Sequence, residues 1–231
     1  MNEFDESIRQ AQKINEGYSG NLHLGILEDV NLSLFFTDIL AAFEDKFPNI
    51  KIHMKQYSFG ELRKKLAGKE LDGILTYSFD IQDQENFEYQ KLYKYQPCWA
   101  IPIANPLSEK TSLSIADLKN EEFILTASED SPLASLILIS LCQKEGGFTP
   151  KIQYTDSLEE VILRLEAGSK CTLINQGLRI AKSNQIKTFP FEDSHFSHTA
   201  YFAFAWMKGH QNTCLKLFIE HLSRYPDIST N

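Results

Sequence analysis

The apolar and polar positions of this chain follow the same order twice, in residues 22–76 and again in residues 123–174. Short apolar runs predict strands, and apolar residues that recur every three or four positions predict helices. The first copy predicts strands at 22–27, 50–54 and 71–76 and helices at 32–47 and 59–67. The second predicts strands at 123–126, 151–154 and 171–174 and helices at 133–144 and 158–167. Each copy is therefore a strand, helix, strand, helix, strand unit.

The second helix of each copy has the same signals at its ends. A serine stands at the N-cap position, a glutamate follows three residues later at the capping-box spacing, and a glycine stands where a left-handed residue ends a helix. These residues are Ser58, Glu61 and Gly68 in the first copy and Ser157, Glu160 and Gly168 in the second. Two such units predict two α/β lobes, with a ligand-binding cleft at the carboxyl ends of their strands.

The segments outside the two copies suggest how the lobes are joined. Residues 96–104 read as an extended crossing between the lobes, and the aromatic run at 199–207 reads as a return crossing. A helix near 212–224 would then pack on the first lobe. At the start, an apolar stripe predicts a short helix ending at Gly17, which must pack on a longer upstream helix or on a partner subunit.

Composition and charge narrow the class of protein. The 231 residues carry a net charge of −8, which argues against this chain itself gripping a nucleic acid backbone. No apolar run approaches the roughly 18 residues of a membrane helix, and the acidic start does not resemble a secretory signal, so we expect a cytoplasmic protein without membrane contact. The four cysteines never form a close pair, and we expect buried reduced thiols.

Several short motifs resemble the LysR-type transcriptional regulators. Residues 16–26 (EGYSGNLHLGI) are similar to the junction where the linker helix of that family meets its effector-binding domain. Further matching segments lie at 42–48, 66–74, 105–107, 115–118 and 166–168. Each motif is weak alone, but their order and spacing cover nearly all of residues 16–222.

The resemblance implies a type 2 periplasmic-binding-protein-like α/β fold, in which two Rossmann-like subdomains are joined by two crossover strands. It implies a linker-helix tail at 1–19, subdomain I at 20–93 and 200–231, and subdomain II at 94–199. It also implies a small-molecule effector, a homo-dimer or tetramer, and DNA contact only through an N-terminal winged helix-turn-helix that this sequence does not contain. We therefore expect the regulatory part of a longer regulator.

In this fold the effector sits where the loops after the strands converge from both lobes. The residues expected there are Glu28, Asp29, Asn31, Tyr77, Ser78, Thr126, Ser128, Ser157 and Asn175. A structural role competes with ligand contact for each of them. Asn31 and Ser157 could instead cap helices, and Tyr77 could be a packed aromatic residue.

Acidic pairs occupy the loop after the first strand of each copy, Glu28 with Asp29 and Glu129 with Asp130. They could cap the following helices and complement the helix dipoles. Alternatively, carboxylates aimed into the cleft would repel anionic effectors and favour a neutral or cationic one. The sequence leaves both interpretations open.

Catalytic signatures are missing from the sequence. There is no phosphate-binding glycine-rich loop, GxSxG or HExxH motif, and His195 and His198 lack a third ligand nearby, so a solvated loop is the expectation. We therefore expect a protein that is not an enzyme and that binds neither a cofactor nor a metal ion. The alternatives are a free-standing solute-binding protein of the same fold, and an enzyme such as a dehydratase or deaminase, which would need an acid–base cluster.

Overall fold

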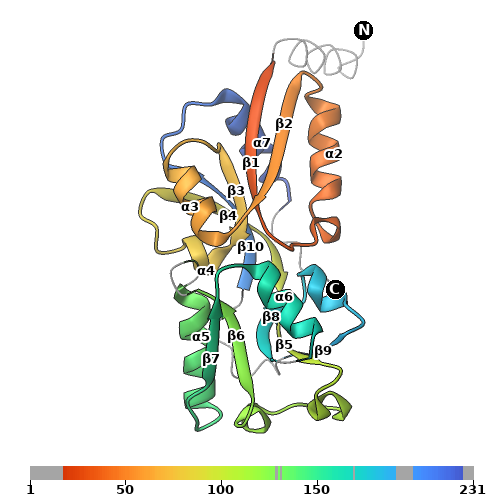
Figure 1. Ribbon diagram of the computed structural model, residues 1–231. Helices are drawn as coiled ribbons and strands as arrows, with labels where there is room; N and C mark the ends of the chain where they lie inside the picture. The colour runs from red at the N-terminus through yellow and green to blue at the C-terminus, as the bar shows by residue number, and fades with distance from the viewer. Residues whose placement is uncertain (1–17, 128–129, 131, 169, 191–199, 226–231) are drawn as a thin grey trace.

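The computed structural model describes residues 18–127, 130, 132–168, 170–190 and 200–225, which form two lobes, one above the other in Figure 1. Lobe one contains β1 (Gly20–Leu27), η1 (Leu32–Leu34), α2 (Thr37–Lys46), β2 (Ile50–Tyr57), α3 (Phe59–Ala67), β3 (Gly73–Tyr77), α4 (Ser78–Ile81), β4 (Phe87–Tyr95), β10 (Ala200–Met207) and α7 (Thr213–Leu222). Lobe two contains β5 (Pro97–Pro102), η2 (Pro106–Glu109), η3 (Ile115–Leu118), β6 (Glu122–Thr126), α5 (Pro132–Lys144), β7 (Lys151–Thr155), α6 (Leu158–Glu166), β8 (Thr172–Asn175), η4 (Arg179–Lys182) and β9 (Ile186–Pro190).

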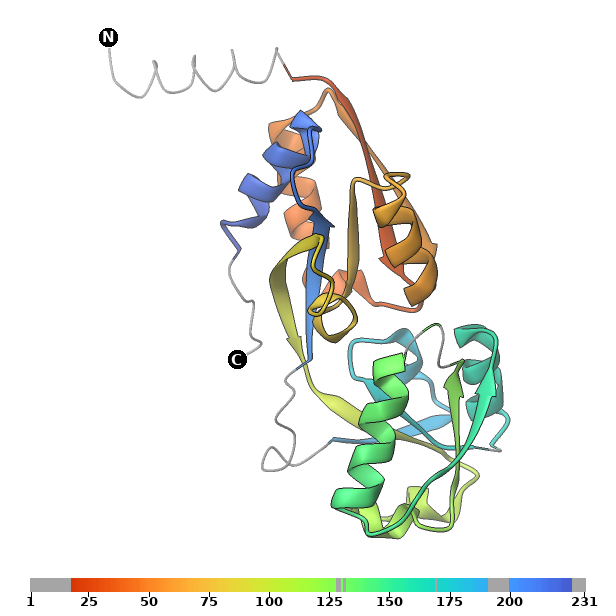
Figure 2. The same cartoon turned by 90° about the vertical axis from the view of Figure 1, so that its left-hand side faces the viewer.

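Lobe one is built on a five-stranded mixed sheet with the order β2-β1-β3-β10-β4. β1 pairs in parallel with β2 and β3, whereas β10 runs antiparallel to β3 and β4. Helices α2 and α7 lie on one side of this sheet and α3 on the other, as Figure 2 shows. Parallel strands need helical crossovers, and α2 and α3 supply them, as the first copy predicts.

Lobe two repeats the same strand order. β6 pairs in parallel with β7, and β8, β5 and β9 form an antiparallel set with β5 in the middle. A parallel bridge between Phe123 and Cys171 joins the two sets, so the strands run β7-β6-β8-β5-β9. This order matches β2-β1-β3-β10-β4 strand for strand, which explains why the sequence pattern occurs twice.

Two segments pass between the lobes. The first lies at Gln96, where β4 of lobe one ends and β5 of lobe two begins. The second runs from β9 to β10 through residues 191–199, which lie outside the described residues, as do His195 and His198. The predicted return crossing at 199–207 corresponds to β10, which belongs to the lobe-one sheet.

Aromatic side chains form much of the lobe-one core. Phe43 and Phe204 both pack edge-on against Phe218 of α7, with ring centroids 5.0 and 5.2 Å away. This contact fixes α7 on lobe one, as the sequence predicts. Lobe two has a second cluster in which Trp99 and Phe123 are almost completely buried.

The predicted helix at 32–47 is not continuous. It is divided into η1 and α2 by Phe35 and Phe36, which lie in a turn and are 6% and 1% exposed. Phe35 stacks on Tyr93, with centroids 5.2 Å apart, whereas Phe36 packs near Phe218. The turn buries two consecutive rings against different elements. This packing is favoured over the continuous helix that the sequence pattern predicts.

The expected left-handed conformation at Gly68 is wrong. Gly68 has φ −75°, and the next residue, Lys69, takes the left-handed value of +59°. In the second copy Gly168 is left-handed, with φ +81°, as predicted. The capping box of Ser58 and Glu61 is present, whereas Ser157 caps α6 and Glu160 pairs with Arg164 instead.

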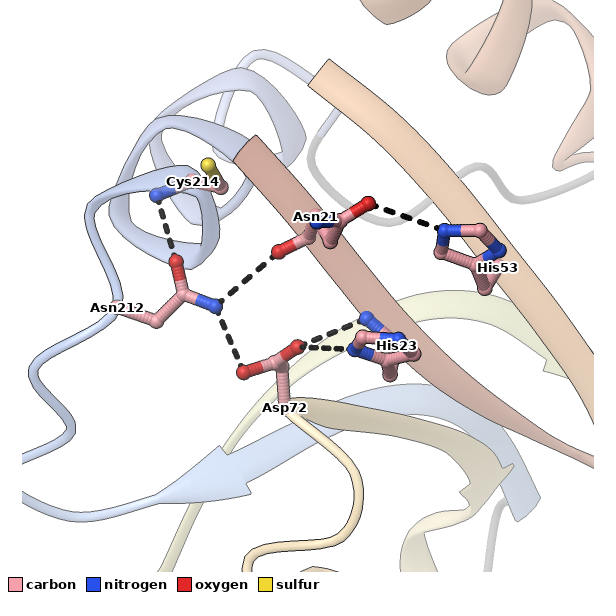
Figure 3. A network of polar contacts seen from close by, with 6 residues as sticks. All are labelled: Asn21, His23, His53, Asp72, Asn212 and Cys214. Carbon is pink, nitrogen blue, oxygen red and sulfur yellow. Dashed lines mark hydrogen bonds and ion pairs between the residues drawn. The ribbon is translucent and has the colours of Figure 1, made fainter. Parts of the chain in front are cut away.

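A polar network closes the end of lobe one where β1 begins (Figure 3). Asn212 accepts a hydrogen bond from the Cys214 N–H at the start of α7 and donates to the Asp72 carboxylate at 2.7 Å. Asp72 in turn accepts from the His23 N–H at 2.8 Å, and the His23 ring stacks on His53 with centroids 5.0 Å apart. The network therefore ties α7 to the strands.

No helix within the described ranges is long and apolar enough to cross a membrane.

Candidate functional site

A cavity of about 540 Å³ lies between the two lobes. Its walls include the carboxyl ends of β1, β3, β6 and β8, represented by Leu27, Tyr77, Thr126 and Asn175. The first turns of α3, α5 and α6 also contribute to the walls. Open α/β sheets bind their ligands at this edge, where backbone N–H groups of helix starts are available.

An aromatic group forms the lobe-one wall. The rings of Tyr77 and Phe79 are stacked at 5.5 Å between centroids, and Phe59 lies 5.9 Å from Phe79. Phe59 is the first residue of α3 and Phe79 belongs to α4, so short helices at the ends of β2 and β3 place both rings. The opposite wall is aliphatic and includes Ala134 and Ile137 of α5.

Two buried polar groups, one from each lobe, interact beside the cavity. The Tyr77 side chain of lobe one is only 2% exposed, and its hydroxyl interacts with the Asn175 side chain of lobe two. Burial raises the pKa of Tyr77 well above its usual value, and the nearby Tyr95 adds to the rise. The hydroxyl is therefore neutral at physiological pH.

Charge is sparse on the cavity walls. Among the described lining residues Lys91 is the one cation, and none is acidic. Lys91 is exposed, and its ammonium lies 4.4 Å from the ring centroid of Tyr201 in a cation–π contact. Ser78 is buried beside Tyr201 and accepts a hydrogen bond from its N–H at 3.4 Å. The site is thus mainly apolar, with a few polar groups.

The structure brings four of the nine expected site residues together on the cavity walls. They are Tyr77, Ser78, Thr126 and Asn175. Asn31 caps η1 by accepting from the Ser33 N–H, and Ser157 caps α6 by accepting from the Glu160 N–H. Neither cap lines the cavity, and Ser128 lies outside the described residues.

The other two, Glu28 and Asp29, belong to the loop between β1 and η1, where the lobes touch. Asp29 has φ +60°, a conformation that Asp tolerates, and its carboxylate accepts from the Ile180 N–H at 3.0 Å. Its carbonyl accepts from the Arg179 N–H at 2.8 Å, and Val30 forms a β-bridge with Leu178. Asp29 therefore joins the lobes instead of lining the cavity.

The second acidic pair also acts across the interface. Asp130 of lobe two accepts hydrogen bonds from the Ser58 hydroxyl and the Gly60 N–H, both at 2.7 Å, at the start of α3 in lobe one. Asp130 therefore contacts a helix start, but this helix belongs to the opposite lobe and is not the following helix that the sequence suggests. Its partner Glu129 lies outside the described residues.

Arg63 extends this contact. Its guanidinium donates to the Asp130 carbonyl at 2.8 Å and pairs with the Asp80 carboxylate. Burial raises the pKa of Asp80 to about 7, more than the neighbouring guanidinium lowers it. Burial likewise raises the pKa of Glu28, and the charges of Glu61, Asp130 and Glu159 raise it further. Several carboxyl groups therefore lie close together at the interface beside the cavity.

Metal binding has no support within the described part of the chain, where no group of three His, Cys, Asp or Glu residues could hold an ion. Cys98, Cys142, Cys171 and Cys214 are free and buried, as expected from the sequence. Burial raises the pKa of the Cys98 thiol to about 12, so it is not a thiolate at neutral pH.

Sequence reasoning missed the rings of Phe59, Phe79, Tyr89 and Tyr201. Phe59 could have been found, because it directly follows the Ser58 cap at the end of a strand. Tyr89 lies on β4, a strand that the sequence analysis does not predict. A register shift in its pairing with β10 leaves Leu92 and Tyr93 both buried and so interrupts the alternation that identifies a strand.

This fold and cavity define the class of two-lobed, periplasmic-binding-protein-like domains. Within that class, the family model of the LysR substrate binding domain matches residues 15–226. The chain belongs to this family, which confirms the resemblance seen in its motifs and the predicted fold class.

Known relatives and solved structures agree with this family assignment. The chain is 27% identical over 236 residues to the HTH-type transcriptional regulator AlsR of Bacillus subtilis (strain 168). The aligned region covers 97% of this chain and 72% of AlsR. The effector binding domain of QuiR in complex with shikimate superposes with a TM-score of 0.73 at 16% identity, covering 90% of this chain and 97% of that one. Full-length CbnR complexed with its target DNA superposes with a TM-score of 0.71 at 16% identity. This match covers 94% of the present chain and 74% of the CbnR chain.

Proposed function

We propose that this chain is the effector-sensing part of a LysR-type transcriptional regulator and binds a small molecule in the cavity between its lobes. The observation that carries the proposal is the cavity itself, about 540 Å³ in volume, which residues of both lobes line. Small-molecule sites are commonly cavities of this size, with apolar walls and a few orienting polar groups.

Ligand binding would act through the contacts that hold the lobes together. Asp29 bonds to η4 on one side of the interface and Asp130 bonds to α3 on another. A ligand that touches both lobes changes the relative free energies of their arrangements, and it can shift the equilibrium only by its difference in affinity for them. We infer that this shift is the regulatory signal.

The signal would be passed on in an oligomer. Exposed apolar side chains include Leu163 on α6, 59% exposed, and Met54 on the edge strand β2, 42% exposed. Such side chains suit contact with a second copy. The proposal includes a homo-dimer or tetramer, DNA contact through an N-terminal domain and a cytoplasmic location. It also includes two subdomains that divide close to the predicted boundaries at 93/94 and 199/200, the first of them at the end of β4.

A thermal-shift screen of metabolites tests the sensing role. A ligand that binds only the folded chain at about 100 times its Kd adds roughly 2.7 kcal/mol to the free energy of unfolding, which raises the melting temperature. The same screen is run on Ala134→Trp, which fills the cavity, and on Leu136→Trp, an exposed position of the same helix. Hits should stabilise the wild type and Leu136→Trp but not Ala134→Trp. Hits that stabilise all three equally would contradict a site in this cavity.

A further inference from the structure

A backbone seam joins the two lobes, and it consists of residues 29–31 of lobe one and residues 177–180 of lobe two. The Asn31 N–H donates to the Gly177 carbonyl at 2.9 Å. This bond adds to an antiparallel bridge and two further hydrogen bonds between the same segments. The seam is therefore a short antiparallel ribbon with one strand from each lobe.

Gly177 has no room for a side chain in this seam. A β-carbon added there would lie 1.7, 2.2 and 2.5 Å from three carbons of the Tyr95 ring, which belongs to lobe one. Carbon atoms in contact are separated by about 3.5 to 4 Å, so a methyl group would require a displacement of about 2 Å. The backbone of Gly177 is not left-handed. Glycine is thus required here by the neighbouring ring and not by the φ angle.

The Tyr95 ring cannot easily move aside, because lobe one holds it on several sides. Its side chain is 3% exposed. The ring packs against those of Tyr93, Tyr77, Phe202 and Phe35, with centroids 4.7, 5.8, 5.9 and 6.1 Å away. Interiors packed this densely transmit a steric clash instead of absorbing it. A side chain on the lobe-two segment would therefore push lobe two away from lobe one.

The seam lies next to both the first crossing and the cavity. The Gln176 N–H donates to the carbonyl of Gln96, where the chain passes from lobe one to lobe two, at 3.1 Å. Asn175 and Leu178, which lie on either side of this contact in the sequence, both line the cavity. Any change in the spacing of the lobes at Gly177 would therefore alter the distance between the cavity walls.

We propose that Gly177 is a positioning residue that sets the spacing of the lobes and thereby the affinity of the cavity for its effector. Without a side chain, the lobe-two backbone lies directly on the Tyr95 ring and completes the seam. A larger residue holds the lobes apart and removes contacts from a ligand that touches both walls. The effect on affinity rests on the proposed sensing function, whereas the effect on spacing does not.

The spacing is measured first, without a ligand. Spin labels on Lys64→Cys in α3 and Gln143→Cys in α5, both exposed positions, report the distance between the lobes by pulsed electron paramagnetic resonance. Labelled chain is diluted with unlabelled chain to suppress distances between copies. The four native cysteines are buried and should not be labelled. Gly177→Ala should change the distance between the labels by about 2 Å.

Gly73→Ala is the matched control. A β-carbon at Gly73 would lie 2.2 Å from the Phe204 ring, a clash of similar severity that is confined to lobe one. This variant should lower stability but leave the distance between the lobes unchanged. Hydrogen exchange at the Asn31 amide should likewise become faster in Gly177→Ala and not in Gly73→Ala, because only the former opens the seam.

A second substitution tests whether the Tyr95 ring is the cause. Tyr95→Val removes the ring carbons that the added methyl group meets. Adding Gly177→Ala to Tyr95→Val should therefore leave the distance between the lobes as it is in Tyr95→Val alone. Circular dichroism and thermal melting establish that each variant is folded. If Gly177→Ala alone does not fold, recovery of folding by Tyr95→Val supports the same contact, and failure to recover overturns it.

Binding is measured with N-phenyl-1-naphthylamine, an uncharged dye whose fluorescence rises in apolar sites. Binding that Ala134→Trp abolishes is binding in the cavity. Gly177→Ala should weaken it by about fivefold or more, because a gap of about 0.5 to 1 Å already removes a quarter to a half of a van der Waals contact. Gly73→Ala should leave the affinity for the dye unchanged.

The outcomes separate this proposal from the sensing function. A distance between the lobes that Gly177→Ala leaves unchanged, or that Gly73→Ala changes equally, overturns the role of Gly177. A changed distance with unchanged dye affinity overturns the link between spacing and binding. If the wild type does not bind the dye, that link and the sensing cavity for an apolar ligand are both contradicted, and the distance measurement separately decides whether Gly177 sets the spacing.

Discussion

At the residue scale, Asp80 is a buried acid whose protonation is linked to folding. Its carboxylate pairs with Arg63 and also interacts with the Thr76 hydroxyl, but the side chain is buried. Burial raises the pKa from 3.8 to about 7 in the folded chain. Between these two values the folded chain holds a proton that the unfolded chain releases, so the free energy of unfolding falls as the pH rises.

Asp80→Asn should remove this pH dependence. Relative to the wild type, the variant should therefore become more stable as the pH rises from about 4.5 to about 8, whatever the constant cost of placing an amide beside Arg63. Urea unfolding at several pH values measures the difference. A difference that does not change over this range would contradict the raised pKa.

Asp117 provides the matched control for this experiment. The hydrogen bond from Lys110, followed by those from Ser114, lowers its pKa to about 2. A lowered pKa gives stability that is lost only as the pH falls toward that value, so both states are ionised throughout the tested range. Asp117→Asn should thus change the free energy of unfolding by a constant amount between about pH 4.5 and about pH 8.

At the element scale, α7 depends on a single asparagine. Asn212 caps the helix through the Cys214 N–H and also binds Asp72, next to the strands (Figure 3). The sequence predicts this helix and its contact with lobe one from its apolar spacing. It does not predict Asp72 as a partner, because the two residues lie far apart in sequence and meet only when β3 has joined the sheet.

Asn212→Ala should lower the free energy of unfolding by about 1 to 2 kcal/mol, since it removes a helix cap and leaves Asp72 without this donor. Chemical denaturation followed by circular dichroism measures the change. The neighbouring exposed Gln211, changed to Ala, is the control and should alter stability by less than about 0.5 kcal/mol. Equal effects of the two changes would show that the cap contributes nothing specific.

At the scale of the whole molecule, Asp130 holds lobe two against the start of α3. Asp130→Ala removes the acceptor of the Gly60 N–H, while Arg63 retains its bond to the backbone carbonyl. Hydrogen exchange at the Gly60 amide should become faster, because more of the population is open at this contact. Glu109→Ala, which removes an exposed carboxylate elsewhere on lobe two, should leave this exchange rate unchanged.

Part of the candidate site could be predicted from the sequence. Tyr77, Ser78, Thr126 and Asn175 were accessible to sequence reasoning because each stands at or just beyond the carboxyl end of a strand, and parallel strands share that edge. Tyr89 was not accessible, because the alternation of β4 is interrupted by its register shift. Asp130 was expected near a helix start, but its role as a cap on the opposite lobe depends on how the lobes meet.

The sequence by itself determined the doubled α/β unit, the class of fold and the family, because hydrophobic periodicity, caps and turn glycines act over a few residues. Tertiary structure alone decided the division of the helix at Phe35 and Phe36, the interface bonds of Asp29 and Asp130, and the mainly apolar character of the cavity walls. These features depend on packing between segments distant in sequence, where burial and partner geometry, and not local propensity, set the free energy.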